Sequence, residues 1–507
     1  MLSIVKSLVL QGLSGVLINV EVDVSAGMPV WDIIGLPDTS LKESKERVKT
    51  AIRNCNIAIP SRRYIINLSP ADLKKEGSYF DLAISIGVLN SLGILNYKEF
   101  ESTIFIGELS LDGKINGVSG ILPMCIEALK YGIKKVIVPK ENVKEAAIIS
   151  GLSVIGIEDL GSLIKYLNGE IIIEEEKVDI KNVFQNSNNS DIDFSEVKGQ
   201  TFAKRALEIA ASGGHNVLMI GTPGSGKTMM AKRVKTILPD LTFKESLEIT
   251  KIYSVSGHMK NQYLITNRPF RSPHHTISAN ALIGGGRTPK PGEISLSHLG
   301  VLFLDELPEF NRNVLEVLRG PLEDKIVNIS RVGASVTYPC NFMLVASMNP
   351  CPCGYFGSSE KECKCTEFQI KNYRNKISGP ILDRIDLVVQ VSNLKYDKFS
   401  NSEEESSEKI KKRVNTARKK QEERYKNYDI FCNSELTIKL QNKFCKISDS
   451  SKEILKKAQE KMNLSSRGIS KILKVSRTIA DLENANNIRD EHILEALQYR
   501  GFDEYDK

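Results

Sequence analysis

The stretch Val217-Leu-Met-Ile-Gly221-Thr-Pro-Gly-Ser-Gly226-Lys227-Thr228 decides the fold of the middle of this chain. An apolar run typical of a buried strand leads directly into the pattern G-x-x-x-x-G-K-[ST], and a helical pattern begins at Met229. Glycines allow backbone N–H groups to turn inward around phosphate oxygens, and the N-terminus of the following helix adds a favourable dipole. The motif predicts a parallel α/β core with a P-loop that binds ATP through Gly221, Thr222, Pro223, Gly224, Ser225, Gly226, Lys227 and Thr228.

Two later apolar runs are expected to complete this site. Val301-Leu-Phe-Leu-Asp305-Glu306 ends in two acids. Asp305 suits the binding of Mg²⁺ together with Thr228, while Glu306 is placed to polarise the attacking water. Phe342-Met-Leu-Val-Ala-Ser-Met-Asn349 ends in an amide, which would lie beside the γ-phosphate if its strand neighbours the strand of Asp305. Lys227 is expected to reach the β- and γ-phosphates.

The order of P-loop, Asp-Glu strand and Asn-ended strand resembles the AAA+ ATPases, in which the asparagine is called sensor 1. The resemblance extends to Gly379-Pro-Ile-Leu-Asp-Arg384-Ile-Asp-Leu387 and implies that Arg384 is the arginine finger inserted into the site of a neighbouring subunit. A guanidinium there stabilises charge that builds on the γ-phosphate, and it acts only in an oligomer. The simpler alternative is that Arg384 pairs with Asp383 or Asp386.

A helical pattern near the C-terminal end carries a further match to the same superfamily. The stretch 464–482 resembles the sensor 2 helix, with Arg467 as the better match and Arg477 as the reserve. A helix that opens with Ser-Ser-Arg places Arg467 in its first turn, at an end that is free to meet phosphate. A solvent-facing arginine is the alternative interpretation.

Several longer stretches are more specific than the ATPase core. They are Gly35-Leu-Pro-Asp-Thr-Ser-Leu-Lys-Glu-Ser-Lys-Glu-Arg-Val48, Arg268-Pro-Phe-Arg-Ser-Pro-His-His-Thr276, Leu282-Ile-Gly-Gly-Gly286, Pro291-Gly-Glu-Ile-Ser-Leu296 and Gly300-Val-Leu-Phe-Leu-Asp-Glu-Leu-Pro-Glu-Phe310. Together, in this order and over essentially the whole chain, they closely resemble the magnesium-chelatase-like AAA+ proteins of the YifB/ComM family. The resemblance implies a hexameric ring with ATP-driven helicase activity and a role in branch migration during natural transformation.

Candidate DNA contacts lie in two segments of the central part. Residues 326–338 read as two short strands around a turn at 331–333, and helicase relatives place such a hairpin in the central pore of the ring. Arg331 near the tip, with Arg271 and Arg287 from a second insertion, are the candidate phosphate contacts. Solvated loop arginines are the alternative for all three.

Two other polar features have simpler interpretations. His274 and His275 are more typical of histidines that pack a loop than of metal ligands or base readers. The basic stretch 409–426 is interrupted by acids, so a solvated helix face is expected, with phosphate contact as the alternative.

The cysteines of the chain are unevenly placed. Cys351, Cys353, Cys363 and Cys365 crowd together directly after Asn349, whereas the other five cysteines are scattered. Four thiolates in a polar loop predict a structural zinc site, although the spacing is C-x-C and not the commoner C-x₂-C. Disulfides are the alternative, which a reducing compartment disfavours.

Composition places the protein in a broad class. The 507 residues suggest about three domains, and a formal charge of +7 is mild for this length. No apolar run approaches the roughly 18 residues that span a bilayer, and the N-terminus lacks a cleavage pattern, so we expect a cytoplasmic protein without membrane contact. The predicted division is an α+β domain over 1–168, a polar linker over 169–192, the AAA+ core over 193–392 and an all-helical lid over 393–507.

The first predicted domain resembles the Lon-protease-like domain through residues 75–83, 106–115 and 136–142. Active Lon-type proteases need a Ser–Lys dyad. Here Tyr79 takes the place of the nucleophile, and the place of the lysine falls near Leu122-Pro123. Ser78 has no evident lysine partner, and a serine without a base is not activated. We therefore expect a domain without peptidase activity.

Three functions remain open at this point. The first is an ATP-driven DNA translocase that promotes branch migration. The second is a protein-remodelling ATPase, which the Lon-like domain suggests. The third is a metal-chelatase motor subunit, which the N-terminal domain and the cysteine cluster count against.

Overall fold

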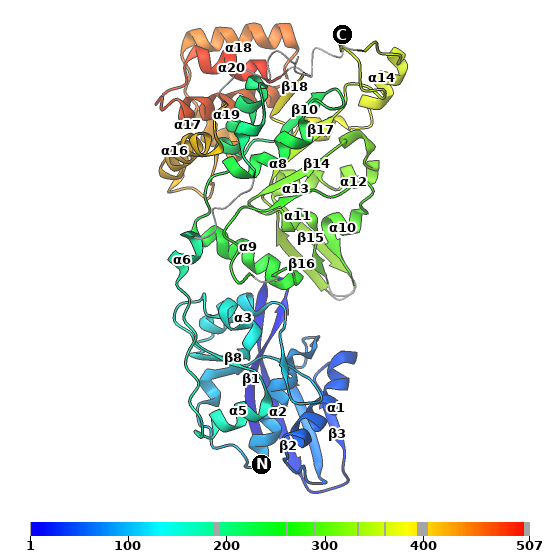
Figure 1. Cartoon of the computed structure of the whole chain (residues 1–507), viewed down its shortest axis with the longest axis vertical. Coiled ribbons are helices and arrows are strands. Elements are labelled where there is room, and N and C mark those ends of the chain that lie inside the picture. Colours follow the sequence, from blue (N-terminus) through cyan, green and yellow to red (C-terminus); the bar gives the residue numbers. More distant parts are fainter. Residues whose placement is uncertain are drawn as a thin grey trace. The chain divides into compact units, whose positions relative to one another are not determined.

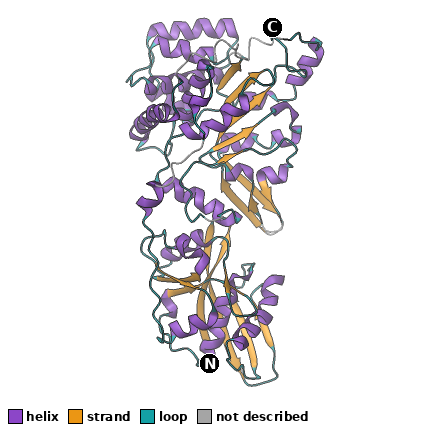
Figure 2. Cartoon of the chain, viewed as in Figure 1, coloured by secondary structure: helices purple, strands orange, loops and turns teal. Residues whose placement is uncertain are grey.

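The computed structural model describes residues 2–185, 192–259, 262–286, 289–331, 334–358, 361–392 and 404–500 (Figures 1 and 2). The chain divides into two compact units. The N-terminal unit comprises Met1–Ser187 and Ser246–Thr266, and the P-loop unit comprises Asn188–Glu245 and Asn267–Lys507. Within the described residues, no helix combines the length and the apolar character needed to cross a bilayer.

The N-terminal unit is built on a mixed seven-stranded sheet with the order β3-β4-β2-β1-β5-β8-β9. Its strands are β1 (Leu2–Gln11), β2 (Ser14–Ser25), β3 (Trp31–Ile34), β4 (Arg63–Ser69), β5 (Thr103–Phe105), β8 (Lys135–Pro139) and β9 (Ser153–Ile157), with the small hairpin β6 (Glu108–Leu109) and β7 (Ile115–Asn116) beside them. In β2, Ile18, Val20, Val22 and Val24 are buried and alternate with less buried polar residues. This alternation with period two is that of a strand with one buried face.

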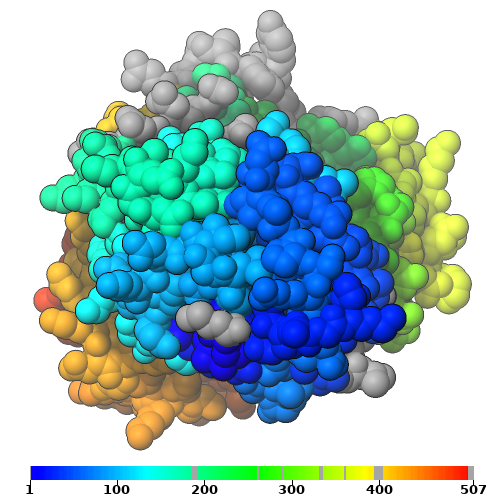
Figure 3. All heavy atoms as spheres, turned by 90° about the horizontal axis from the view of Figure 1, so that it is seen from below, coloured from blue at the N-terminus to red at the C-terminus, as the bar shows by residue number. Residues whose placement is uncertain are grey.

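Helices pack against this sheet. They are α1 (Thr39–Asn54), α2 (Asp81–Ser91), α3 (Ile121–Lys130), α4 (Val143–Ala146) and α5 (Leu160–Leu167). Helix α1 begins after Asp38, whose Oδ1 accepts a hydrogen bond from the N–H of Leu41 at 2.8 Å and so caps the helix. Figure 3 shows one face of this unit, on which the blue and cyan segments lie side by side.

The predicted linker is not wholly extended. Within it, α6 (Ile180–Gln185) forms a short helix. Its apolar residues Ile180, Val183 and Phe184 pack on a small cluster around Leu122 and Ile148. Spacing of i, i+3 and i+4 places these three side chains on one helical face, which gives the polar tract an anchor.

A segment from the middle of the chain belongs to the N-terminal unit. Residues Ser246–Thr266, which include most of α9 (Phe243–Ser256), pack with this unit although they follow the P-loop helix in sequence. The carbonyl of Ser254 accepts a hydrogen bond from the N–H of Gly120 at 3.1 Å, and its hydroxyl donates to the buried carboxylate of Glu145. The sequence analysis placed this segment inside the AAA+ core.

The P-loop unit contains a five-stranded sheet with the order β11-β14-β17-β10-β18, in which every neighbouring pair is parallel. The strands are β10 (Val217–Gly221), β11 (Phe270–Arg271), β14 (Val301–Leu304), β17 (Met343–Met348) and β18 (Leu387–Val391). A mixed α/β chain with a parallel sheet agrees with the predicted fold class. The carboxyl ends of parallel strands meet at one edge, so this order brings the predicted site residues together.

Short helices and hairpins surround this sheet. The helices are α7 (Thr201–Gly213), α8 (Lys227–Ile237), α10 (Ala279–Ile283), α11 (Glu293–Leu296), α12 (Arg312–Glu316), α13 (Arg319–Asp324), α14 (Glu367–Arg374) and α15 (Gly379–Leu382). The hairpins pair β12 (Gly284–Gly285) with β13 (Lys290–Pro291), and β15 (Ile326–Arg331) with β16 (Ala334–Pro339). The second hairpin confirms the two short strands expected around 331–333.

Residues 404–500 form helices connected by turns. These are α16 (Ser407–Tyr425), α17 (Ile438–Phe444), α18 (Asp449–Met462), α19 (Ser466–Leu482) and α20 (Asp490–Gln498). Val414 of α16 and Ile479 of α19 share one apolar core with Ala210 of α7 and Val217 of β10. Residues 404–500 and the parallel sheet are therefore packed as one body, and the interpretation of this part as a separate lid stays a prediction.

Candidate nucleotide site and its surroundings

The P-loop connects β10 to α8 with backbone geometry that glycine permits. A Cβ atom on Gly221 would lie 2.3 Å from the carbonyl oxygen of Val391, so only glycine fits beside β18. Gly226 has φ of 88° and caps α8, and no side-chain cap hydrogen bond is present at this helix end among the described residues. The first N–H groups of α8 are thus available to a phosphate, as the motif predicts.

Lys227 links the P-loop to the end of β17. Its Nζ donates to the carbonyl oxygens of Gly221 at 2.7 Å and Thr222 at 2.9 Å, and to Oδ1 of Asn349 at 3.2 Å. The side chain is buried, and burial lowers the pKa of Lys227 below its usual value while the charges of nearby acids oppose the shift. Because β17 lies between β10 and β14, Asn349 meets the condition set for a residue beside the γ-phosphate.

Asp305 stands at the carboxyl end of β14 and is held by three donors. Its Oδ2 accepts from the Thr228 hydroxyl at 2.6 Å, and its Oδ1 accepts from the Ser347 hydroxyl and from the N–H of Glu306 at 3.1 Å. Glu306 has φ of 53°, in the left-handed region, which turns the chain sharply directly after Asp305. Ser347 is a site residue that sequence reasoning missed, although its position two residues before Asn349 on an apolar strand was a signal.

These residues fit a magnesium-bound nucleotide. A hydroxyl and a carboxylate, the oxygen ligands that Mg²⁺ prefers, stand 2.6 Å apart at Thr228 and Asp305. The buried hydroxyl of Thr222 has no hydrogen-bond partner within the described part of the chain. One lysine, one free helix start and one unsatisfied hydroxyl therefore converge at the loop, as an anion site requires.

Arg384 lies between α15 and β18. Its guanidinium pairs with the carboxylate of Glu323 and donates to the carbonyl oxygen of Pro380 at 3.1 Å. The partner is thus neither Asp383 nor Asp386, the two acids that the sequence analysis named for its simpler role. The finger role needs a second subunit and stays a prediction.

Arg467 is in the first turn of α19, as expected, after Ser465, whose hydroxyl accepts from the N–H of Gly468 at 3.1 Å. Its side chain is 67% exposed, with the carboxylate of Asp383 at 3.8 Å. Arg477 is 2% exposed and is bound to Asp481 and to main-chain carbonyls. Burial inside the core leaves Arg477 unable to meet a phosphate, so Arg467 is the better candidate.

The four clustered cysteines converge. Their Sγ atoms all lie within 4.8 Å of one another, with Cys351 and Cys353 3.3 Å apart and Cys363 3.6 Å from each of these two. All four are free thiols. The N–H of Phe356 donates to Sγ of Cys351 at 3.3 Å, and hydrogen bonding from the backbone of Tyr355 lowers the pKa of Cys353 to about 6. Four cysteine side chains that converge in this way fit a four-coordinate zinc site.

Comparison with known proteins places this geometry in a family. The chain is 40% identical over 508 residues to the competence protein ComM of Haemophilus influenzae, covering 98% of this chain and 97% of ComM. It is also 40% identical over 506 residues to YifB of Escherichia coli, covering 99% and 97%. The chain belongs to the ComM/YifB family of magnesium-chelatase-like proteins.

Family profiles agree with this membership. "Magnesium chelatase, subunit ChlI" matches residues 193–399, "Subunit ChlI of Mg-chelatase" matches residues 20–142, and "Magnesium chelatase, subunit ChlI C-terminal" matches residues 404–500. The magnesium-chelatase 67 kDa subunit of Chlorobaculum parvum is 28% identical over 166 residues, which is 31% of this chain and 23% of that subunit. Membership in this AAA+ family implies ATP and Mg²⁺ and supports an ATPase.

Of the three arginines predicted to contact DNA in this ComM/YifB chain, the structure describes the side chain of Arg271 only. Arg271 at the end of β11 forms a two-pronged ion pair with Glu293, with both N–O distances 2.6 Å. A phosphate would have to displace that carboxylate, so a DNA contact at Arg271 requires this pair to open. Arg331 ends β15, but its side chain lies outside what the structure describes, and Arg287 lies outside the described residues altogether.

The histidines pack on each other and on Phe310, whereas the basic helix is ion-paired within the unit and is not the solvated face expected from the sequence. His274 and His275 stack on each other with ring centroids 4.1 Å apart, and His275 packs edge-on against Phe310. On α16, Lys411 pairs with Asp240 and Arg413 with Glu208 and Glu405, so much of the predicted basic stretch is neutralised within the unit.

The residues predicted from the sequence to lie at or beside the positions of a Lon-type dyad have other partners in this ComM/YifB chain. The Ser78 hydroxyl donates to the carboxylate of Glu108, and no lysine amine contacts it within the described residues. Burial raises the pKa of Tyr79, whose hydroxyl meets the backbone of Leu10. Leu122, near the predicted place of the lysine, is fully buried among apolar residues.

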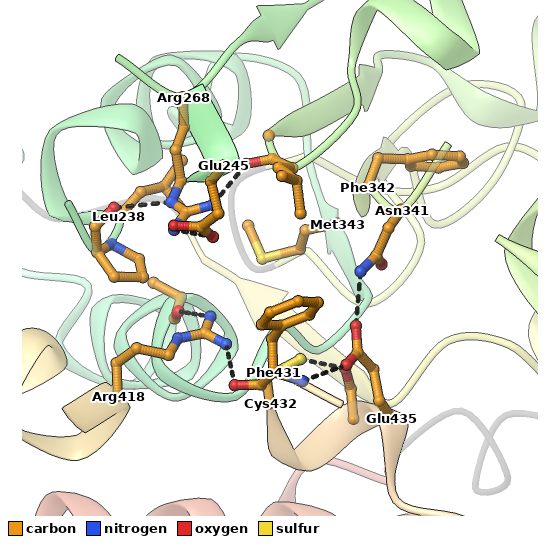
Figure 4. Close-up of a pocket in the computed structure, with 16 residues that line it drawn as sticks. Leu238, Glu245, Arg268, Asn341, Phe342, Met343, Arg418, Phe431, Cys432 and Glu435 are labelled. Carbon is orange, nitrogen blue, oxygen red and sulfur yellow. Dashed lines mark hydrogen bonds and ion pairs between the residues drawn. The ribbon is translucent and has the colours of Figure 1, made fainter. Parts of the chain in front are cut away.

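A second charged cluster lies at the opposite edge of the parallel sheet, where the strands begin (Figure 4). Arg268 donates to the carboxylate of Glu245 at 2.8 Å and to the carbonyl oxygens of Pro239 at 2.7 Å and Leu299 at 2.9 Å. The side chains of Arg268 and Glu245 are 10% and 13% exposed. Arg418 faces the same pocket, so the cluster holds two guanidinium groups with Glu245 as a counter-charge.

Replacing Glu245 with glutamine is expected to lower the free energy of unfolding of the P-loop unit by about 3 kcal/mol, because it leaves a buried guanidinium without its counter-charge. Glutamine keeps an acceptor for the N–H of Thr242, so the start of α9 stays capped and only the charge is removed. Urea unfolding followed by circular dichroism measures the change. The matched control is Asp449→Asn in the exposed pair with Lys452, for which a much smaller loss is expected because solvent screens both charges. Equal losses in both variants would contradict the importance of the buried pair.

Proposed function

We propose that this chain is the protomer of a hexameric, ring-forming AAA+ ATPase that couples ATP hydrolysis to translocation on DNA. Its work would be helicase action or branch migration in recombination or natural transformation. The observation that carries the ATPase part is that two hydrogen-bonded pairs, Lys227 with Asn349 and Thr228 with Asp305, lie side by side at the carboxyl edge of the parallel sheet. The relative named for competence, matched over 98% of this chain, supports the biological setting.

The proposed roles follow from where each side chain stands. Lys227 and the P-loop amides bind the β- and γ-phosphates, and Thr228 and Asp305 hold Mg²⁺, which supplies charge neutralisation when it is bound. Glu306, directly after the Mg²⁺-binding acid, orients and polarises the attacking water. Asn349 is held 3.2 Å from the Lys227 amine and senses the γ-phosphate, while Arg384 and Arg467 add positive charge from outside the P-loop.

DNA contact is proposed for the hairpin of β15 and β16 and for Arg331, Arg271 and Arg287. The hairpin is inserted between β14 and β17, the two strands that carry Asp305 and Asn349. The chain reaches the hairpin from Asp305 through α12 and α13 and continues from it into the start of β17, so movement at the nucleotide site would be passed to the hairpin through these elements. This arrangement supports coupling between hydrolysis and a bound strand.

Further parts of the proposal concern the N-terminal unit and the cysteines. We propose that the N-terminal unit is a Lon-like domain without peptidase activity, since Tyr79 takes the place of the nucleophile and Ser78 is bound to Glu108 and not to a lysine. We also propose that Cys351, Cys353, Cys363 and Cys365 hold a structural zinc ion, and that the protein works in the cytoplasm. Four protein ligands would leave no open position for catalysis by that metal.

A protein-remodelling ATPase is the second candidate, because the N-terminal unit exposes apolar side chains around β3. Met28 is 82% exposed, Leu36 55% and Ile34 49%, which suits contact with an unfolded polypeptide. A chelatase motor is less well supported, since the match to the 67 kDa subunit covers only 31% of this chain.

ATP turnover by the full chain is expected to rise severalfold with single-stranded or branched DNA at low salt and to lose this stimulation as salt is raised, because phosphate contacts release counterions. The measurement compares single-stranded, duplex and branched DNA with an unfolded polypeptide as control. Turnover that ignores every DNA would overturn the DNA motor. Stimulation by polypeptide alone would favour remodelling instead.

A further inference from the structure

The segment between β17 and α14, residues 350–366, is called the Cys loop, and the structure describes its residues 350–358 and 361–366. It starts directly after Asn349 and carries the four converging thiols. Cys351 is fully buried, whereas the other three cysteines are partly exposed. One end of the loop is therefore fixed in the core. The conformation of the rest depends on whether a metal ion links the cysteine sulfur atoms.

The Cys loop packs directly on the P-loop. Gly354 has φ of 85°, and a Cβ atom there would lie 2.7 Å from two ring carbons of Pro223. The same Cβ would lie 3.9 Å from Cγ of Asn349. Only a glycine permits this approach, so the backbone of the Cys loop forms one wall of the P-loop.

Helix α14, which follows the Cys loop, also contacts the residues directly after β17. The Tyr373 hydroxyl of α14 meets the backbone of Asn349, and the Arg374 guanidinium donates to the carbonyl oxygen of Pro350 at 3.3 Å. Arg374 also lies over the Phe356 ring, 5.4 Å from its centroid. Asn349 is thus held between the P-loop lysine and the Cys loop.

We propose that zinc bound by the Cys loop positions Pro223 and Asn349, so that nucleotide affinity depends on the zinc content of the protein. Gly354 is the positioning residue that transmits this dependence. The inference rests on the proposed function in one respect, that the P-loop binds nucleotide.

The physical basis is that a loop with few buried apolar residues gains its fixed shape from the metal. Zinc binding to four thiolates supplies folding free energy that such a segment otherwise lacks. Without it, the close contact between Gly354 and Pro223 is lost, because packing at van der Waals distance requires a fixed backbone. Displacement of the P-loop by about 1 Å is enough to reduce a rate or an affinity by up to roughly 10²-fold.

The test uses the full chain and two readouts besides turnover, which are zinc content by atomic spectroscopy and the Kd of a fluorescent ADP. Cys353→Ser is expected to lose zinc and to weaken ADP binding by roughly 10- to 100-fold. Because that variant also loosens the loop, Gly354→Ala is the sharper probe. It keeps all four thiols and is expected to retain zinc while weakening ADP binding by a similar factor, with KM for ATP raised more than kcat is lowered.

Gly357→Ala is the matched control. Gly357 lies in the same loop with φ of 73°, so alanine causes similar backbone strain there, but its Cβ would have no atom within 4 Å. This variant should keep both zinc and affinity. Wild-type protein without zinc, or equal ADP affinity in the Gly354 and Gly357 variants, would overturn the inference. If wild-type protein binds no ADP at all, the proposed ATPase itself fails, while the zinc measurement still reports on the Cys loop.

Discussion

Replacing Arg384 with alanine is expected to lower ATP turnover by about 10³- to 10⁵-fold, the range that arginine fingers supply in other nucleotide hydrolases. The guanidinium would act on the γ-phosphate bound by a neighbouring subunit. Within its own subunit the Arg384 side chain is 12% exposed and is bound to Glu323, which is 58% exposed, so this pair has to open before the guanidinium can act on a neighbouring subunit. Binding of ADP should change little, since the finger meets the phosphate that ADP lacks.

Two comparisons separate this role from an ordinary ion pair. Glu323→Ala removes the same pair from the other side, and it should leave turnover within a few-fold of wild type. Mixing Arg384→Ala with Lys227→Ala should restore part of the turnover, because some interfaces then combine an intact P-loop with an intact finger. Equal losses in the Arg384 and Glu323 variants, with no recovery on mixing, would show that Arg384 has only a local structural role.

The residues of the nucleotide site could be predicted closely because each of them lies directly beside its strand or helix in the sequence. Each of β10, β14 and β17 is a short apolar run followed at once by its functional residue, so strand and site are read from the same few positions. The one long-range condition, that the strand of Asn349 neighbours that of Asp305, holds because β17 pairs with β14. The gathering of four cysteines is local in the same way, since they lie within one loop.

What could not be predicted depends on contacts between distant positions. The packing of Ser246–Thr266 with the N-terminal unit joins Ser254 to Glu145, 109 residues apart, and no periodic pattern carries that information. The partner of Arg384 is Glu323, 61 residues earlier, although two acids stand within two residues of it. Glu293 likewise neutralises Arg271 from a separate short helix. Charge pairing follows the tertiary fold, so a basic residue in a loop does not by itself indicate a nucleic-acid contact.

Replacing Lys227 with alanine is expected to lower ATP turnover by about 10²- to 10³-fold and to weaken nucleotide binding as well, because a positive charge aimed at the phosphates is lost. The amine is now held by two P-loop carbonyls and by Asn349, so its removal also frees the asparagine from its fixed position. Lys235→Ala, on the exposed side of the same helix, is the control with an equal change in net charge.

Burial lowers the pKa of Lys227, and this gives the prediction a pH dependence. The cationic form binds phosphate, so the advantage of wild type over Lys227→Ala should be complete at neutral pH and should shrink as pH rises toward the lowered pKa. An arginine at this position stays charged throughout, so Lys227→Arg should show no such decline in whatever binding it retains. Measuring the Kd of fluorescent ADP for the three proteins between pH 7 and about pH 10 tests this. A wild-type advantage that stays constant over that range would mean that the lysine acts through packing and not through its charge.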